Sequence, residues 1–239
     1  MSNLVLIRHG QASMFADDYD KLSPLGEEQS RLLGKFWRNR AVTFDEIYVG
    51  PRKRQIRTGE LVLEHFNSEN KYLPQPIVIE ELDEYDGDGI LDALLPIAAE
   101  RDLRISKLVE EYEQNLNSPE RFRFFQRMFE SVTKLWVEGE IHSDRVESWR
   151  SFHDRVRRGY HRILSGEGRN RRIAVFTSGG PISVAVQLAT RAPEQTAIEL
   201  NWRLRNCSLT EIVFSKNRLS LDSFNSIPHL EDAALWTYR

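Results

Sequence analysis

A histidine lies two residues after a short apolar run near the start of the chain. Leu4 to Ile7 form that run, and Arg8, His9 and Gly10 follow it. Neutral imidazole is nucleophilic near neutral pH because its unperturbed pKa is about 6.5. An adjacent guanidinium can neutralise phosphate oxygens as charge develops, and glycine lets the backbone approach a ligand closely. We therefore expect His9 to accept a phosphoryl group, with Arg8 binding the phosphate.

A second group of polar residues follows another expected strand, which ends at Val49. Four basic residues, Arg52, Lys53, Arg54 and Arg57, lie at the start of the helix expected next. Helix amides and guanidinium groups both favour phosphate, so this position suits an anion site. The four side chains do not all face one pocket, although Arg54 and Arg57 share a helix face.

An acid is also needed to protonate the oxygen that leaves phosphorus. The segment 80–86 contains Asp83, Glu84 and Asp86 and follows a third expected strand, Ile77 to Ile79. A solvated acidic loop is the alternative interpretation of this segment. The residues by themselves do not decide which carboxyl group is the proton donor.

The turn after the apolar run Ile173 to Thr177 is the last candidate. It reads Ser178, Gly179, Gly180 and Pro181 and opens a helix, so its backbone amides could bind phosphate oxygens. Ser178 is a poor candidate for a hydrolase nucleophile, because the segment lacks the Gly-x-Ser-x-Gly spacing and no base partner is evident.

Three segments together resemble the histidine phosphatase superfamily, which includes phosphoglycerate mutases, fructose-bisphosphatase-type enzymes and acid phosphatases. Residues 6–13 resemble the nucleophile segment, and residues 22–29 resemble the helix start that follows it. Residues 50–58 are similar to the family pattern Ser-Pro-x-x-Arg-x-x-x-Thr, with Gly50 in place of the serine. The resemblance implies that His9 is the nucleophile, that Arg8 and Arg54 bind phosphate, and that Arg57 is structural or peripheral.

The same resemblance assigns the remaining site residues. Aligning Leu82, Glu84 and Gly87 with a Leu-x-Glu pattern implies Glu84 as general acid, but the spacing to the glycine is one residue short and leaves Asp83 and Asp86 open. Ser178, followed by Gly179, stands where the family usually carries a second phosphate-binding histidine. Serine still donates a hydrogen bond but carries no charge, which weakens one contact to phosphate.

Two later segments also resemble the family, and both have structural explanations. Glu147 and Ser148 resemble a helix entry in which Ser148 is a cap. Residues 206–210 resemble an Asn-x-Ser-x-Thr strand entry. The resemblance therefore covers most of the chain except a helical insert.

Alternating apolar runs and helical patterns predict an α/β fold with a mostly parallel sheet and flanking helices, as in phosphoglycerate mutases. Ser23 and Pro24 predict a helix start, and two strands from Leu209 are expected to form a terminal hairpin. Residues 88–140 show only helical patterns, with Ser118 as an expected cap, and predict a helical insertion within a single domain of residues 1–239.

Composition excludes several classes of protein. The net charge of −3 gives no general attraction to nucleic acid or to membrane surfaces, and the basic segment 169–172 is interpreted as a polar loop. The single cysteine, Cys207, fits a reducing compartment, and no apolar stretch is long enough for a signal peptide or a membrane span. We expect a soluble, cytoplasmic protein, with the five other histidines structural or at the surface.

The leading hypothesis is a phosphatase that needs no metal or cofactor and hydrolyses a phosphorylated small molecule or phosphoprotein through His9. A phosphoglycerate mutase uses the same catalytic motifs, but the insert lacks an obvious run of basic residues to anchor such a substrate. A protein that binds phosphorylated ligands without turnover is a third hypothesis, motivated by Ser178. Neither the substrate nor the oligomeric state follows from the sequence.

Overall fold

The computed structural model describes residues 1–13, 20–65, 74–216 and 218–238 of the chain. These residues form two compact units. The first combines Met1–Glu84 with Arg155–Arg239, and the second is Tyr85–Asp154. The second unit includes the whole of the expected helical insertion and extends beyond it at both ends.

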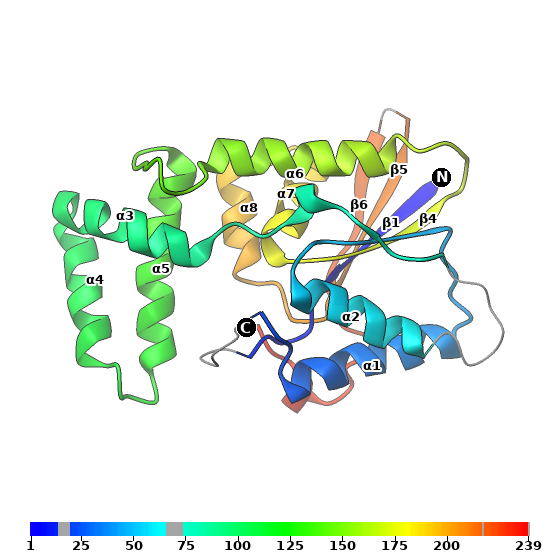
Figure 1. The fold of residues 1–239 in the computed structure, drawn as a ribbon, viewed down its shortest axis with the longest axis horizontal. Coiled ribbons are helices and arrows are strands. Elements are labelled where there is room, and N and C mark those ends of the chain that lie inside the picture. Colours follow the sequence, from blue (N-terminus) through cyan, green and yellow to red (C-terminus); the bar gives the residue numbers. More distant parts are fainter. Residues whose placement is uncertain (14–19, 66–73, 217, 239) are drawn as a thin grey trace. The chain divides into compact units, whose positions relative to one another are not determined.

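The first unit is built on one six-stranded sheet (Figure 1). Its strand order is β3-β2-β4-β1-β5-β6. The first four strands in this order pair in parallel, whereas β5 pairs antiparallel with both β1 and β6. The predicted α/β fold with a mostly parallel sheet and a terminal hairpin is therefore confirmed. The strands are β1 (Ser2–Arg8), β2 (Glu46–Val49), β3 (Ile77–Val78), β4 (Arg172–Thr177), β5 (Leu209–Ser215) and β6 (Arg218–Ser226).

The register of the parallel strands brings their carboxyl ends together. Arg8 at the end of β1 lies opposite Thr177 at the end of β4, and Val49 at the end of β2 lies opposite Phe176. The backbone N–H of His9 continues this pairing by donating to the Thr177 carbonyl at 2.9 Å. The segments that follow the three strands therefore start at one edge of the sheet.

Helices cover both faces of this sheet: α1 and α2 lie on one side, and α7 with the later part of α6 lies on the other (Figure 1). Ser23 caps α1 as predicted, since its hydroxyl accepts the backbone N–H of Gly26 at 3.1 Å. Ser148 also caps its helix as predicted, accepting from Ser151. These helices are α1 (Pro24–Asn39), α2 (Lys53–Glu64), α6 (Trp149–Leu164), α7 (Gly179–Thr190) and α8 (Glu194–Asn201).

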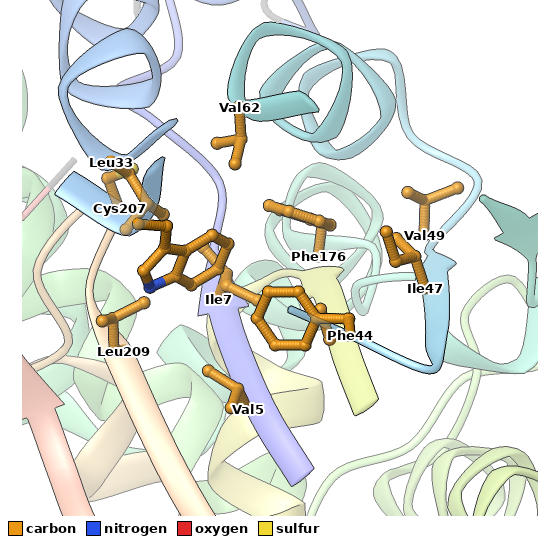
Figure 2. Close-up of a cluster of buried hydrophobic side chains, with 12 residues drawn as sticks. Val5, Ile7, Leu33, Phe44, Ile47, Val49, Val62, Phe176, Cys207 and Leu209 are labelled. Atoms are coloured by element: carbon orange, nitrogen blue, oxygen red, sulfur yellow. The ribbon is translucent and has the colours of Figure 1, made fainter. Parts of the chain in front are cut away.

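A hydrophobic cluster joins α1 and α2 to the sheet (Figure 2). Strand residues such as Ile7 and Phe176 pack there with Leu33 of α1 and Val62 of α2, all fully buried. Figure 2 shows that these side chains come from both helices and from the central strands. This packing holds α1 and α2 on one face of the sheet.

The second unit is helical, as expected. Its helices are α3 (Gly87–Arg101), α4 (Leu103–Gln114) and α5 (Arg121–Glu138). The prediction that Ser118 caps a helix was wrong. The helix α5 begins at Arg121, and Ser118 instead lies in the preceding turn, where its hydroxyl accepts the N–H of Glu120. Trp136 centres an aromatic cluster within the unit, with ring contacts to Tyr85, Trp149 and Phe152.

The interpretation of residues 169–172 as a polar loop needs correction. Arg171 is buried, and its guanidinium binds both carboxylate oxygens of Glu46 at 2.6 and 2.9 Å. Arg172 already belongs to β4. A guanidinium can be buried when its donors are satisfied, and here a carboxylate and backbone carbonyls satisfy them. No helix in the described part of the chain is long and apolar enough to cross a membrane.

Candidate active site

His9 is 5% exposed and lies just beyond β1. Its Nδ1 lies 2.7 Å from the Gly10 carbonyl oxygen, which can only accept, so Nδ1 carries the ring proton. Its Nε2 accepts a hydrogen bond from Arg54 Nε at 3.1 Å. Burial and the charges of Arg54 and Arg8 lower the pKa of His9 well below 6.5. His9 is therefore a neutral imidazole whose unprotonated nitrogen, Nε2, faces Arg54.

Gly10 has a packing role that was not expected from the sequence. A Cβ atom at Gly10 would lie 2.3 Å from the Gly26 carbonyl oxygen in α1. Its backbone N–H donates to the hydroxyl of Thr58 at 3.0 Å, and that hydroxyl donates to the Arg54 carbonyl at 2.7 Å. The segment after His9 is thus held between the start of α1 and the start of α2.

The two arginines expected to bind phosphate are both buried next to His9. Arg54, at the start of α2, is 6% exposed and pairs through Nη1 with Asp20 at 2.8 Å. Arg8 donates through Nη1 to the carbonyl oxygen of Leu204. Each guanidinium is therefore held by part of its donor set while it raises the positive potential at His9. Asp20 was not anticipated from the sequence.

The other basic residues of the α2 segment point to other partners. Arg57 is paired with Glu60 at 3.0 Å on the solvent side of the helix, and Arg52 is paired with Asp83. Only Arg54 of this group is hydrogen-bonded to the His9 imidazole. This placement agrees with the expectation that Arg57 is structural or peripheral.

The three acid candidates have different environments. Both carboxylate oxygens of Glu84 accept the Gly180 N–H at 3.1 Å, at the start of α7. Asp83 is engaged by Arg52, and Asp86 caps α3 in the second unit by accepting the Gly89 N–H at 2.9 Å. Glu84 is therefore the carboxyl group placed at the strand-to-helix turn where the phosphate-binding candidates lie.

The acidic segment is tied to the sheet by two side chains. The hydroxyl of Thr177, the last residue of β4, donates to the Leu82 carbonyl at 3.0 Å. Arg155 donates to the carbonyls of Glu81 and Asp83 at 3.0 and 3.1 Å. These bonds set the position from which Glu84 reaches α7.

Ser178 and Gly179 lie where β4 passes into α7. Ser178 is completely buried, and its hydroxyl oxygen accepts a hydrogen bond from Gln55 Nε2 at 2.7 Å. A Cβ atom at Gly179 would lie 2.0 Å from Asn201 Oδ1 and 3.9 Å from Arg8 Nε. Gly179 thus lets the start of α7 approach the Asn201 side chain of α8 closely, and Arg8 lies within van der Waals distance of the same position. The Gly180 N–H of this helix start donates to the carboxyl group of Glu84, and helix starts favour anionic groups.

Sequence reasoning missed several residues that support the site. Asp20 orients Arg54, Gln55 binds Ser178, and Asn206 Nδ2 donates to the His9 carbonyl at 3.4 Å. Asn206 stood in a segment with family resemblance, so a signal for it existed. Asp20 and Gln55 carried none, because their roles come from contacts between separate segments.

In the part of the chain that the structure describes, the other titratable residues indicate no second catalytic or metal-binding site. Within the described ranges, no group of three or more His, Cys, Asp and Glu side chains could hold a metal ion. His229 is buried against Phe36, and burial lowers its pKa to about 3. Cys207 is buried in the hydrophobic cluster, and burial raises the pKa of its thiol to about 12.

The family comparison agrees with this geometry. The model of the histidine phosphatase superfamily, branch 1, matches residues 4–227. The chain belongs to this superfamily, as its motifs predicted. It is therefore related to phosphatases, including two curated proteins that it matches over short segments.

Broad-specificity phosphatase YOR283W of Saccharomyces cerevisiae is 36% identical over 73 residues, which are 28% of this chain and 32% of that protein. The mitochondrial serine/threonine-protein phosphatase Pgam5 of Caenorhabditis elegans is 32% identical over 78 residues, which are 33% of this chain and 27% of that protein. The match thus spans only about a third of each relative, and it does not transfer their substrates to this chain.

Solved structures of low sequence identity share the fold. Phosphoglycerate mutase from Bacillus anthracis has a TM-score of 0.63 at 18% identity, with 96% of this chain and 95% of that chain covered. Phosphoserine phosphatase from Entamoeba histolytica, solved in complex with phosphoserine, has a TM-score of 0.60 at 19% identity, with 96% and 100% covered. Both similarities establish the architecture.

Proposed function

We propose that this protein is a phosphatase that hydrolyses a phosphoester through a phosphohistidine intermediate on His9. The observation that supports it most is the state of His9: a buried, neutral imidazole with its proton on Nδ1 and its Nε2 next to Arg54. Such a ring is prepared for nucleophilic attack, and the nearby guanidinium groups favour a phosphate in front of it.

In the first step, a phosphate monoester binds with its oxygens on Arg8, Arg54 and the start of α7. Its anionic oxygens attract the Arg54 guanidinium, which releases His9 Nε2. The Nε2 lone pair forms a bond to phosphorus as the ester P–O bond breaks. Protonated Glu84 transfers its proton to the departing oxygen, so an alcohol leaves and Glu84 becomes a carboxylate.

In the second step, water attacks the phosphorus of the phosphohistidine. The Glu84 carboxylate takes a proton from this water, the P–N bond breaks and its electron pair returns to Nε2. Inorganic phosphate leaves, and both His9 and Glu84 regain their starting forms. All proton transfers use residues of the chain, so we propose a mechanism without a metal ion or cofactor.

We favour a phosphatase over a phosphoglycerate mutase because of the second unit. Two basic side chains of α4 and α5 pair with acids: Arg104 with Asp102 and Arg127 with Glu111, at 2.7 and 2.8 Å. These pairs do not form a cluster of cationic groups for a sugar-acid carboxylate. We propose that residues 88–140 act as the specificity-determining insertion of a single catalytic domain.

For the substrate we propose a phosphorylated small molecule, with a phosphoprotein as the second candidate. Structures of similar fold include a phosphoserine phosphatase solved with phosphoserine and with 3-phosphoglyceric acid. The relative Pgam5 is a protein phosphatase, which motivates the second candidate. Cys207, the single cysteine, is unpaired and buried, which suits a reducing compartment such as the cytoplasm.

Phosphate release from a panel of small phosphoesters and phosphopeptides tests the proposal with wild type and His9→Ala. Loss of the nucleophile should lower kcat by roughly a thousandfold or more. His161→Ala, at an exposed position of α6, is the matched control and should keep full activity. Activity that survives His9→Ala would rule out this nucleophile. Isomerised phosphoglycerate without free phosphate would identify a mutase instead.

A further inference from the structure

Gln55, the residue after Arg54, is completely buried and has a fixed amide orientation. The backbone N–H of Arg52 lies 3.0 Å from Gln55 Oε1, and Gln55 Nε2 lies 2.7 Å from the hydroxyl oxygen of Ser178. A backbone N–H can only donate, so the amide oxygen must face Arg52. The amide nitrogen therefore faces Ser178 and donates to it.

This orientation determines what the Ser178 hydroxyl can do. Its oxygen accepts from Gln55, so its proton points in another direction. Among the described residues, the bond from Gln55 is the only hydrogen bond that the Ser178 side chain makes, although the residue is completely buried. A buried donor without an acceptor is costly and requires an explanation. An acceptor supplied by a ligand would satisfy it.

The residues around Ser178 indicate which ligand this is. Ser178 follows Thr177, whose carbonyl accepts the His9 N–H. It precedes Gly179, where an added Cβ atom would lie 3.9 Å from Arg8 Nε. Gln55 itself follows Arg54, which binds His9 Nε2. Ser178 thus lies between two backbone neighbours of the candidate site, and its hydroxyl is bound by Gln55 of α2, the helix that also carries Arg54.

Gly50 makes the arrangement sterically feasible. A Cβ atom at Gly50 would lie 2.2 Å from Gln55 Oε1, closer than any real contact allows. Gly50 and Ser178 are two of the positions at which the chain departs from the family pattern, and Gln55 lies against both. The two departures are therefore parts of one local arrangement.

We propose that Gln55 is a positioning residue that turns Ser178 into a hydrogen-bond donor for the phosphoryl oxygens of the substrate. This inference rests on the proposed function. A neutral donor with a fixed direction provides one contact to the transferring group, at the strand-to-helix turn beside Arg8 and Glu84. Gln55 does not touch the substrate and acts only through Ser178.

Two substitutions separate this role from simple packing. Ser178→Ala removes the donor and should lower kcat/KM for para-nitrophenyl phosphate by roughly tenfold to a hundredfold. Gln55→Glu keeps the size of the side chain and the oxygen that accepts from Arg52. Its second carboxylate oxygen, however, accepts a hydrogen bond from the Ser178 hydroxyl, so that the hydroxyl proton points away from the ligand. A comparable loss is expected. Ser178→Thr keeps the hydroxyl and should restore most of the activity.

The double variant Ser178→Ala with Gln55→Glu gives the decisive comparison. If Gln55 acts through Ser178, the combined loss is about tenfold smaller than the product of the two single losses, because only the charge of the new carboxylate still acts. Thermal unfolding of each variant shows whether it is folded. The inhibition constant for inorganic phosphate should rise in Ser178→Ala, a change that a packing role would not cause.

The outcomes separate a failure of the proposed function from a failure of the role given to Ser178 and Gln55. An inactive wild type, or activity that survives His9→Ala, overturns the proposed function. In that case, calorimetric binding of inorganic phosphate to wild type and to Ser178→Ala still tests whether the Ser178 hydroxyl donates to phosphate. A wild type that depends on His9, with unchanged kcat/KM and phosphate affinity in Ser178→Ala, overturns this inference alone. Losses that multiply independently in the double variant overturn the role of Gln55.

Discussion

The two edges of the sheet in the first unit offer opposite arrangements of polar groups. At the carboxyl edge, His9, Arg54 and Ser178 are buried and hydrogen-bonded to one another or to neighbours from other segments. At the amino edge lies a cavity of about 1170 Å³ whose lining includes the exposed side chains of Arg191 and Lys216. Size and positive charge alone would favour the amino edge as a phosphate site.

Helix direction explains why the amino edge is the weaker candidate. α6 and α7 end there, and the carbonyls at helix ends carry partial negative charge. Arg171 donates to the carbonyls of Ile163, Leu164 and Gly166, at the end of α6, while it binds Glu46. Basic residues at this edge therefore complement helix ends.

The carboxyl edge has the reverse polarity, because α7 begins there and its Gly180 N–H donates to the carboxyl group of Glu84. We therefore propose that phosphate binds at the buried, oriented donors of this helix start. Net positive charge in a large cavity is insufficient.

A pair of arginine substitutions, one at each edge, should give the largest difference. Arg54→Gln removes a buried guanidinium bonded to His9 and should lower kcat/KM by roughly a hundredfold or more. Arg191→Gln removes an exposed charge and should leave kcat/KM unchanged within about twofold. Steady-state phosphate release measures both variants.

The same two variants can also show that the edges do not differ in substrate binding. Equal losses in the two variants would show that charge over the whole unit, rather than local bonding, draws the substrate. In that case the loss would shrink as salt is added, since exposed charges are screened. A loss confined to Arg54→Gln and insensitive to salt would support the distinction between the edges.

The sequence allowed His9, Arg54 and Ser178 to be placed together because each directly follows a strand or starts a helix. Parallel strands end at one edge, so their positions along the chain predict their proximity. The start of α1 could be predicted on similar grounds, since Ser23 caps it as expected.

Residues that act through tertiary contacts could not be predicted. Asp20 reaches Arg54 from a separate segment, and Gln55 looked like an ordinary helix residue until its bond to Ser178 was seen. Arg171 lay in a polar-looking segment, yet its donors are matched by Glu46, which is 125 residues away in the chain. Sequence patterns report local periodicity, and such partners leave no local signal.

A substitution at the amino edge should affect stability without affecting catalysis. Arg171→Leu leaves Glu46 and the last carbonyls of α6 without their donor and should lower the free energy of unfolding by about 3 kcal/mol. Urea denaturation measures this change, and kcat/KM well below the unfolding temperature should match wild type. Arg191→Leu is the exposed control. Reduced kcat/KM with unchanged stability would contradict a purely structural amino edge.

The smallest effect concerns the pH dependence of stability. Burial, followed by the charges of Arg54 and Arg8, lowers the pKa of His9 in the folded protein. Below pH 6.5 the unfolded chain therefore binds a proton at His9 that the folded chain does not. Falling pH then favours unfolding, by at most about 1.4 kcal/mol per pH unit for this group.

His9→Gln should accordingly flatten the decline in the free energy of unfolding between about pH 6.5 and 5, measured by urea denaturation. His229→Phe is the matched comparison, because burial also lowers the pKa of His229, to about 3, away from any proposed chemistry. It should flatten the same decline while keeping kcat. An unchanged slope in His9→Gln would mean that His9 is protonated in the folded protein, and the carboxyl edge would then lack its neutral nucleophile.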